Sequence, residues 1–220
     1  WDAFDEGMDE KGYVRLINDR EYQASIVHQG KHSGYIVAGV DPAAGGDNSA
    51  IVVKSGNLQE IVFNQKMPDT MDLVGVAMDI SNKYNVDMWI VDSTGVGKGV
   101  YDRLRELNYT VKGVMFGEKS EDAQFGNLKA ELHWKERKWL LSGGRLLNNY
   151  GWNEFEIVKY KNKDGKIIIQ PKEDLFREGI MSPNCVDAAV LTMAVSEGMV
   201  RNKRIMNRPF YDQMVDIYNA

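Results

Sequence analysis

Apolar runs alternate with amphipathic segments along most of this chain, and this alternation predicts strands interspersed with helices. Residues 35–40 and 88–91 are almost continuously apolar, which is typical of strands buried on both faces. Residues 49–54 and 58–66 predict two more strands, joined by a turn at Ser55-Gly56-Asn57. A further strand is predicted at 111–116.

Helical spacing of apolar residues appears in four segments. Thr70 is expected to cap a helix that carries Leu73, Val76, Ala77 and Ile80 on one side, and the next helix carries Val100, Leu104 and Leu107. Longer helices are predicted over 127–141 and 184–199, and a hairpin over 155–160 and 166–170. The order predicts an α/β fold in which a mixed sheet has helices on both faces and an auxiliary β-hairpin.

The amino-acid composition excludes several classes of protein. The 220 residues suit one α/β domain, and no apolar run approaches the roughly 20 residues that span a bilayer. A single cysteine, Cys185, rules out an internal disulfide framework, and three histidines make a zinc site improbable. The net charge of -5 argues against a passive DNA-binding module but is compatible with a nuclease that gathers carboxylates around metal ions.

Two of the buried strands end in an aspartate that is followed by a glycine-rich loop. Asp41 ends the first strand and Asp92 the later one. Ligands of open α/β sheets collect at the carboxyl ends of the strands, so these two side chains are expected to lie side by side. The alternative is that each aspartate only caps its turn.

A third aspartate stands alone in an apolar helix. Asp187 is the only charged residue of the stretch 186–195. An isolated buried carboxylate costs several kcal/mol, so a cation is expected to accompany it. No lysine or arginine lies within one helical turn, which favours a metal ion; stabilisation by the helix dipole is the alternative. Three carboxylates without cysteine or histidine favour two Mg²⁺ or Mn²⁺ ions and the hydrolysis of phosphodiester bonds.

Three motifs together resemble one known family. They are Gly39-Val40-Asp41-Pro42-Ala43-Ala44-Gly45-Gly46-Asp47, Val91-Asp92-Ser93-Thr94-Gly95-Val96-Gly97 and Ser182-Pro183-Asn184-Cys185-Val186-Asp187-Ala188. They resemble the nuclease domain of the large terminase subunit of tailed bacteriophages, over about 35–195. The resemblance implies an RNase H-like fold in which Asp41, Asp92 and Asp187 hold two divalent ions and cut concatemeric double-stranded DNA during genome packaging.

The resemblance also implies a domain plan and partners. Residues 1–34 are expected to be a lead-in rather than core, with Asn18 capping a short helix over 19–23; they resemble the linker from an N-terminal packaging ATPase that this sequence lacks. Residues 35–199 would be the nuclease and 200–220 a tail. Expected partners are the ATPase domain, the small terminase subunit and the portal protein, at the procapsid portal in the host cytoplasm, with no membrane.

Further residues are candidates for supporting roles. Asp47 is either an outer metal ligand or a stabiliser of its loop, and Asn184 is either a ligand or a helix cap. Many family members carry an acidic residue at the place of Asn184. Candidate DNA contacts, weighed against ordinary solvent-exposed positions, are Lys98, Lys129, His133, Lys159, Lys161 and Lys163. Trp134 and Trp139 are expected to pack in the core.

Three other functions are compatible with the same superfold or the same acids. A Holliday-junction resolvase would prefer four-way junctions to linear duplex. An actin-like or sugar-kinase-like ATPase would bind ATP and needs a second domain. A non-catalytic module that docks onto the packaging motor would gain no stability from metal ions.

Overall fold

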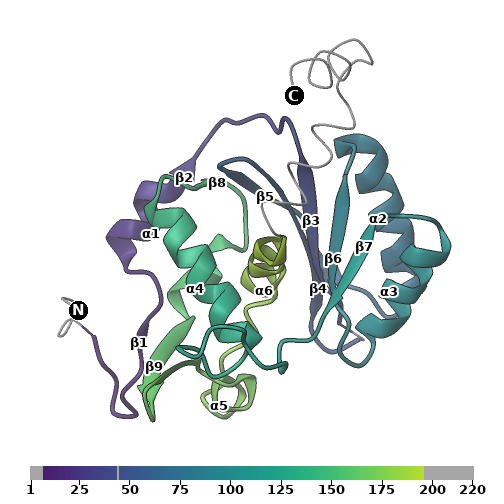
Figure 1. Cartoon of the computed structure of the whole chain (residues 1–220). Helices are drawn as coiled ribbons and strands as arrows, with labels where there is room; N and C mark the ends of the chain where they lie inside the picture. Colours follow the sequence, from purple (N-terminus) through teal and green to yellow (C-terminus); the bar gives the residue numbers. More distant parts are fainter. Residues whose placement is uncertain (1–6, 44, 196–220) are drawn as a thin grey trace, which may run out of the picture.

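The computed structural model describes residues 7–43 and 45–195 and has a central mixed sheet (Figure 1). The seven strands lie in the order β2-β8-β5-β4-β3-β6-β7. Their bounds are β2 Ile26–Val27, β3 Ile36–Asp41, β4 Asn48–Ser55, β5 Leu58–Lys66, β6 Met88–Asp92, β7 Val111–Val114 and β8 Arg145–Leu147. Only β4 runs antiparallel to its neighbours, so the other six strands end at the same edge of the sheet.

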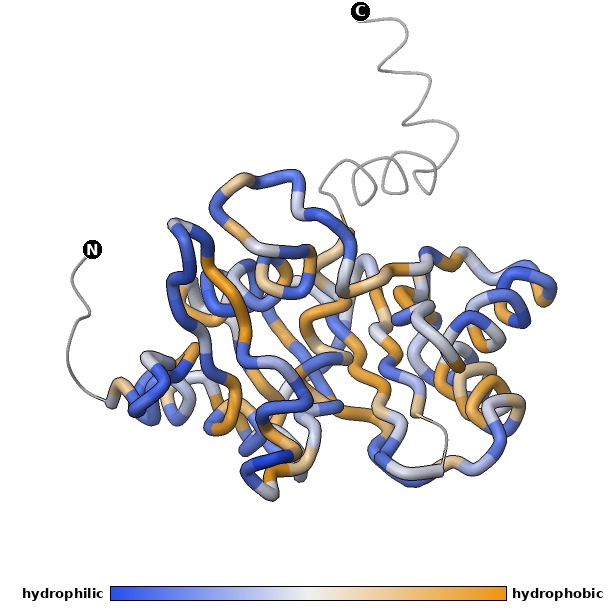
Figure 2. Tube along the Cα trace, turned by 90° about the horizontal axis from the view of Figure 1, so that it is seen from below, coloured by the Kyte–Doolittle hydropathy of each residue, from blue (hydrophilic) through white to orange (hydrophobic). Residues whose placement is uncertain are grey.

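Helices cover both faces of this sheet. On one face lie α2 (Thr70–Tyr84) and α3 (Gly97–Glu106), and on the other lie α4 (Leu128–Leu141) and α6 (Asn184–Leu191), as Figure 1 shows. Figure 2 shows hydrophobic residues concentrated along the central strands. The mixed sheet with helices on both faces confirms the predicted fold class.

The pleat of β3 distributes its side chains between two cores. Ile36, Ala38 and Val40 pack with α2 and α3, whereas Val37 packs in the core of the α4 and α6 layer. Side chains alternate along a strand, so Gly39 and Asp41 lie on the same face as Val37. The same parity in β6 puts Asp92 on the face of Met88 and Ile90.

A smaller sheet stands beside the main one. It consists of β1 (Val14–Arg15), β9 (Lys159–Lys163) and β10 (Lys166–Ile169), in the order β1-β9-β10. The predicted hairpin is therefore present, with β1 as an added third strand. Leu16 and Ile17 follow β1 and are almost completely buried, so the expectation that the lead-in lies outside the core was wrong for this stretch.

Several predicted boundaries differ from those observed. The strand predicted at 155–160 begins only at Lys159, because Trp152–Glu156 forms a 3-10 helix, η1, whose Trp152 and Phe155 stack in the core. Asp69, not Thr70, caps α2. The helix predicted over 184–199 ends at Leu191 and continues as the 3-10 helix η2 (Thr192–Ala194); positions 196–199 and the predicted tail over 200–220 lie outside the described residues.

The remaining helices are α1 (Asp19–Ser25) and α5 (Lys172–Arg177). Asn18 caps α1 with a complete capping box, which confirms the helix expected there. Over the described ranges, no helix combines the length and the apolar composition needed to cross a bilayer.

A buried polar cluster ties β5 to the layer of α4 and α6. The Gln59 Nε2 atom donates to Glu136 Oε2 at 3.0 Å and to Thr192 Oγ1 at 3.2 Å. Glu136 is completely buried, and this burial raises its pKa to about 7 against the opposing effects of Gln59 and Lys54. Glu136 Oε1 and Gln59 Oε1 lack hydrogen-bond partners in the described structure, which fits a protonated carboxyl.

This cluster predicts an unusual dependence of stability on pH. The folded chain holds a proton on Glu136 that an unfolded glutamate loses near its ordinary pKa of about 4.3. The contribution of this group to stability therefore falls as the pH rises between roughly 4.5 and 7. Glu136→Gln is expected to exceed the wild type in unfolding free energy by up to about 3 kcal/mol near pH 8 and to match it near pH 4. Urea unfolding at both pH values measures this difference.

Glu131 on the same helix is the matched control. Its carboxylate pairs with Lys135 at 2.7 Å and accepts from Ser120 at 2.6 Å, and these contacts outweigh burial and lower its pKa. Glu131→Gln is expected to lose stability near pH 8. The same response from both variants would contradict a protonated Glu136.

Candidate active site

Two of the candidate aspartates occupy adjacent positions on neighbouring parallel strands. Val40 of β3 pairs with Val91 of β6, so the next residues, Asp41 and Asp92, are neighbours at the carboxyl ends of the two strands. Asp41 is buried, whereas Asp92 is half-buried and its Oδ1 accepts from the Thr94 amide at 3.0 Å. Both side chains belong to the face that α6 covers, as the strand parity requires.

The third aspartate reaches the same place from the first turn of α6. A Cβ atom on Gly39 would lie 2.0 Å from the Ala188 carbonyl oxygen, so α6 sits directly on the backbone of β3. Gly97 allows a similar approach of α3, since a Cβ there would lie 1.8 Å from the Asp92 carbonyl oxygen. These two glycines let helices close over the strand ends that carry the acids.

Lysines from two other elements neutralise Asp187. Lys129 Nζ on α4 and Lys172 Nζ on α5 each lie 3.0 Å from Asp187 Oδ2. Lys172 Nζ also lies 3.7 Å from Asp41 Oδ2, so one ammonium group joins two of the aspartates. The absence of a lysine or arginine within one turn of Asp187 therefore did not indicate the absence of a basic partner, since both lysines come from other elements.

His133 lies against the same carboxylate. Its Nδ1 donates to the Lys129 carbonyl at 2.9 Å, and its Nε2 lies 3.4 Å from Asp187 Oδ1. Neither Nε2 nor Oδ1 makes a hydrogen bond in the described structure. His133 is completely buried and Lys129 points at the acid, so neither the expected DNA contact nor the solvent-exposed alternative fits these two residues: α4 packs them against α6.

The charges of this group are strongly interdependent. Burial raises the pKa of Asp41 to about 7, with Asp187 and Asp92 adding to the effect and Lys172 opposing it. Burial also acts against ionised Asp187, but Lys129 and Lys172 outweigh it and hold its pKa well below the ordinary value. Asp187 is thus the acid of the group whose ionised form the neighbouring lysines favour.

Glu154 of η1 fixes the start of α6. Its Oε2 accepts from the backbone amides of Cys185 at 2.7 Å and Val186 at 3.1 Å, which would otherwise be unpaired at the helix N-terminus. Burial raises the pKa of Glu154 to about 7. Glu154 was not predicted from the sequence because no element was expected at its position, just before the strand predicted at 155–160, and Lys172 was not predicted because α5 is too short to show a helical period.

Other candidate residues lie around rather than within this group. Asn184 is buried as the first residue of α6, and Pro183 rather than Asn184 is the N-cap. Asp47 is exposed and lines a hollow with Lys172. Lys98 is exposed at the start of α3 and pairs with Asp102 at 2.8 Å.

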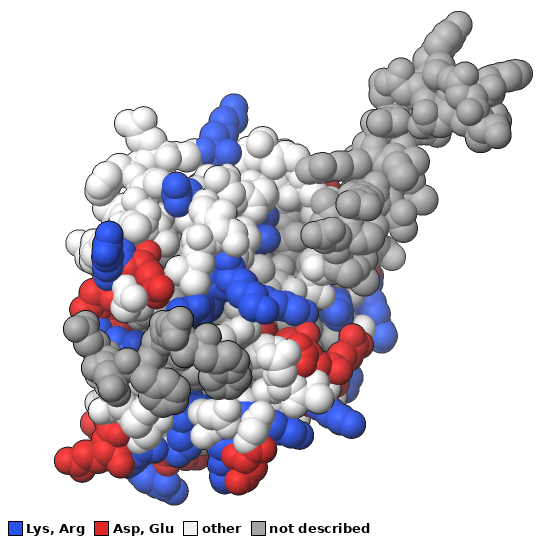
Figure 3. All heavy atoms as spheres, turned by 60° about the vertical axis from the view of Figure 1, so that its left-hand side comes forward, with Lys and Arg blue, Asp and Glu red and all other residues white. Residues whose placement is uncertain are grey.

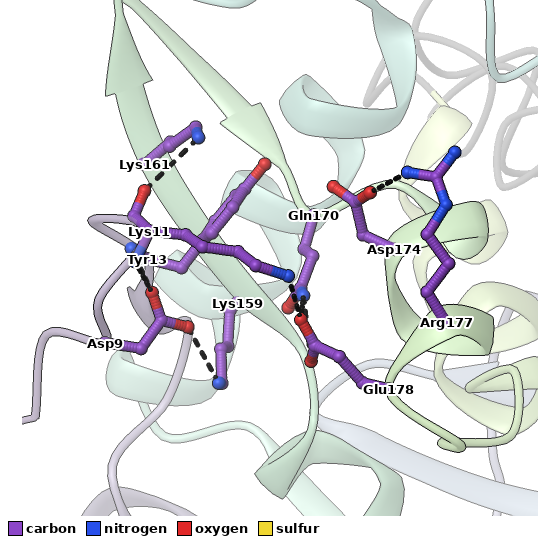
Figure 4. A network of polar contacts seen from close by, with 9 residues as sticks. All are labelled: Asp9, Lys11, Tyr13, Lys159, Lys161, Gln170, Asp174, Arg177 and Glu178. Atoms are coloured by element: carbon purple, nitrogen blue, oxygen red, sulfur yellow. Dashed lines mark hydrogen bonds and ion pairs between the residues drawn. The ribbon is translucent and has the colours of Figure 1, made fainter.

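Two lysines of the β9–β10 hairpin, Lys159 and Lys161, contact the N-terminal segment (Figure 4). Lys159 Nζ pairs with Asp9 at 3.0 Å, and Lys161 Nζ lies 4.1 Å from the Tyr13 ring centroid and donates to the Lys11 carbonyl. Lys163 is exposed beside the turn. Figure 3 shows acidic and basic side chains intermixed on this side of the molecule rather than one basic surface.

The acids do not form a preassembled chelating cluster. Across residues 7–43 and 45–195, no three aspartate, glutamate, histidine or cysteine side chains are grouped closely enough to hold a metal ion by themselves. The Lys172 ammonium group stands between Asp41 and Asp187 instead. The site therefore already places a positive charge among its carboxylates.

The close approach of α6 to β3 predicts a sensitive position. Gly39→Ala would bring a methyl group against the backbone of Ala188, which cannot move without displacing α6. We expect a loss of about 3 kcal/mol in unfolding free energy, measured by urea denaturation. Gly75→Ala on the exposed side of α2 is the control, since a Cβ there meets nothing within 4 Å, and it should stay equal or gain up to about 1 kcal/mol. Wild-type stability of Gly39→Ala would contradict this packing.

Comparison with known proteins places the fold. No protein-family model and no curated protein matches this sequence. A variant of the large terminase subunit of bacteriophage Sf6, solved with calcium, superposes with a TM-score of 0.73 at 17% identity, covering 83% of this chain and 100% of that one. The nuclease domain of the large terminase subunit gp2 of bacterial virus Sf6 gives 0.71 at 18% identity, with the same coverage.

A second phage provides another match. The large terminase nuclease of thermophilic phage G20c, with bound magnesium, gives a TM-score of 0.60 at 14% identity and covers 79% of this chain and 94% of that one. Together with the strand order, these matches show that this chain has the RNase H-like fold of the nuclease domains of phage large terminase subunits.

Proposed function

We propose that this chain is a divalent-metal-dependent endonuclease that cuts concatemeric double-stranded viral DNA during genome packaging. The observation that carries the proposal is that Asp41 and Asp92 end neighbouring strands and that Lys172 joins Asp41 to Asp187, although the three acids come from distant parts of the chain. The fold supports it, since the similar structures are terminase nuclease domains, solved with calcium, manganese or magnesium.

The residues present suit two hard divalent ions. The donor set is made of carboxylate oxygens from Asp41, Asp92 and Asp187, which Mg²⁺ and Mn²⁺ prefer. Asp187 Oδ1 is buried and makes no hydrogen bond of ordinary geometry among the described residues, with His133 Nε2 as its neighbour at 3.4 Å. Lys172 Nζ contacts two of the carboxylates, at a point where the acids already require a cation. Asp47 and Asn184 remain candidates for outer ligands.

Bound ions of this kind supply activation of a water and stabilisation of the leaving 3′ oxygen. The chain's own residues orient the acids for that chemistry. Strands β3 and β6 hold Asp41 and Asp92 in fixed register, and Glu154 fixes the first turn of α6, which carries Asp187. Lys129 remains paired with Asp187 Oδ2 from the protein side and limits the negative charge of the group.

The setting of the reaction follows from the same proposal. Double-stranded DNA is the substrate, and Lys98 and Lys163 are exposed candidates for phosphate contacts. Residues 35–199 carry the proposed active site, and residues 1–34, which contribute Leu16, Ile17 and β2 to the same fold, lead to a packaging ATPase. The small terminase subunit and the portal protein are the further partners, at the procapsid portal in the host cytoplasm.

Cleavage and metal binding test the proposal together. The purified chain is expected to nick or linearise supercoiled plasmid with Mn²⁺ or Mg²⁺, and chelation of the metal should stop the reaction. Asp92→Asn should lower the cleavage rate by roughly 100-fold or more while retaining the wild-type circular dichroism spectrum. Mn²⁺ at about 100 times its Kd should stabilise the wild type by about 2.7 kcal/mol, observed as a higher Tm.

Asp79→Asn is the matched control, because Asp79 is an exposed aspartate on α2, on the face of the sheet opposite α6. It should cleave plasmid and respond to Mn²⁺ as the wild type does. A wild type that neither cuts DNA nor gains stability from Mn²⁺ would overturn the proposal in favour of a non-catalytic docking module. Preference for four-way junctions over linear duplex would instead indicate a resolvase.

A further inference from the structure

A hollow opens beside the acids, between the loop that follows β3 and the segment from α5 to residue 182. Its volume is about 640 Å³, within the range of pockets that enclose small ligands. Among the residues that line it are Asp47, Lys172, Phe176, Arg177, Met181 and Ser182. The proposed nuclease chemistry assigns no role to most of these side chains.

Two large apolar side chains stand in solvent at this hollow. Phe176 is 84% exposed and Met181 is 82% exposed. Phe176 belongs to α5, whose Leu175 is buried and anchors the helix, so the ring is presented outward by the helical spacing. Exposed apolar groups that gather at one place mark a surface for binding.

The hollow is continuous with the group of acids through Lys172. The same side chain lines the hollow and lies within 3.0 Å of Asp187 and 3.7 Å of Asp41. A molecule in the hollow therefore lies next to the carboxylates at which the proposed cleavage takes place. Phe176 is four residues after Lys172, which places both on the same face of α5.

Two polar side chains at the hollow, those of Arg177 and Ser182, are available to bind a ligand. Arg177 has a side chain that is 75% exposed and pairs only with Asp174, three residues earlier, in the contacts of the described chain (Figure 4). Such an exposed pair exchanges readily for a phosphate, which a guanidinium binds through two hydrogen bonds. The Ser182 hydroxyl oxygen is buried and has no hydrogen-bond partner among the described residues.

We propose that this hollow binds one unstacked nucleobase of the DNA strand that is being cut, with the base stacked on Phe176. Met181 supplies apolar contact beside the base, Ser182 offers a hydroxyl to its polar edge, and Arg177 binds the adjacent phosphate. This assignment rests on the proposed nuclease function and adds to it a contact with the bases.

A nucleic acid fits this combination better than a protein segment does. An exposed aromatic ring beside cationic side chains is the arrangement that binds single strands, because every base offers a π-face and every nucleotide a phosphate. The position beside the acids also favours a nucleic acid as the ligand, since the strand to be cut has to pass there. A protein partner remains the outcome that the experiment below would favour if DNA binding ignored Phe176.

The test is a double-mutant cycle on DNA binding. The protein carries Asp92→Asn to prevent cleavage, and the probe is a labelled duplex with a single-nucleotide flap, either intact or with the flap base removed. Phe176→Ala is expected to weaken binding of the intact flap by about 5- to 150-fold, the range for loss of one stacked base. Removing the flap base should weaken DNA binding to the same extent in the protein that retains Phe176. The losses of affinity from the two changes should not add.

Matched variants separate stacking from other effects. Phe176→Tyr keeps the ring and should restore affinity for the intact flap. Tyr150→Ala removes another aromatic side chain, 97% exposed and absent from the lining of the hollow, and should leave affinity unchanged. Equal affinity of Phe176→Ala and its parent for both probes, or losses that simply add, would overturn the proposal.

Cleavage by the same variants with an intact Asp92 distinguishes the two proposals. If the wild type cuts plasmid with Mn²⁺ and the cycle shows no coupling, only the base-binding role fails. If the cycle shows coupling but no variant cuts DNA, the base-binding role stands and the nuclease function fails. If the wild type neither binds the flap probe nor cuts DNA, both fail.

Discussion

The ionised Asp187 carboxylate inside the protein is the constraint around which the site is arranged. Every residue of α6 is buried, and a lone charge in such a helix would cost several kcal/mol. The fold resolves this by directing side chains from α4 and α5 at one carboxylate, so these elements have to be assembled together. Gly39 and Glu154 serve the same end, since one lets α6 reach the sheet and the other fixes its first turn.

The pleat of the sheet accounts for the other two acids. Asp41 and Asp92 end strands whose odd and even positions face different cores, and their parity directs both toward α6. A strand one residue longer or shorter would direct its terminal carboxylate to the layer of α2 and α3 instead. The geometry of the site is thus a consequence of strand register as much as of the identity of the acids.

The distinction between the identity of the acids and the contacts that position them explains which parts of the site could be predicted from the sequence. The long strands and helices carry strong periodic signals, and the three aspartates stand out because each interrupts an apolar run. Lys129, Lys172 and Glu154 do not stand out, because their roles depend on contacts between elements distant in the chain. Lys129 looks like part of a solvated helix face, and α5 and η1 are only six and five residues long, too short for periodicity to identify them. Local patterns identified the acids but not the groups that balance and position them.

The N-terminal segment contacts β9 and the end of α5, the helix that begins with Lys172. Asp9 holds β9 through Lys159, and Lys11 holds the end of α5 through Glu178, at 2.6 Å (Figure 4). These attachments are solvent-accessible ion pairs, which contribute little to stability and weaken as salt is added. Salt therefore weakens the contacts of residues 9 and 11 before those of Tyr13, Leu16 and Ile17, which are buried.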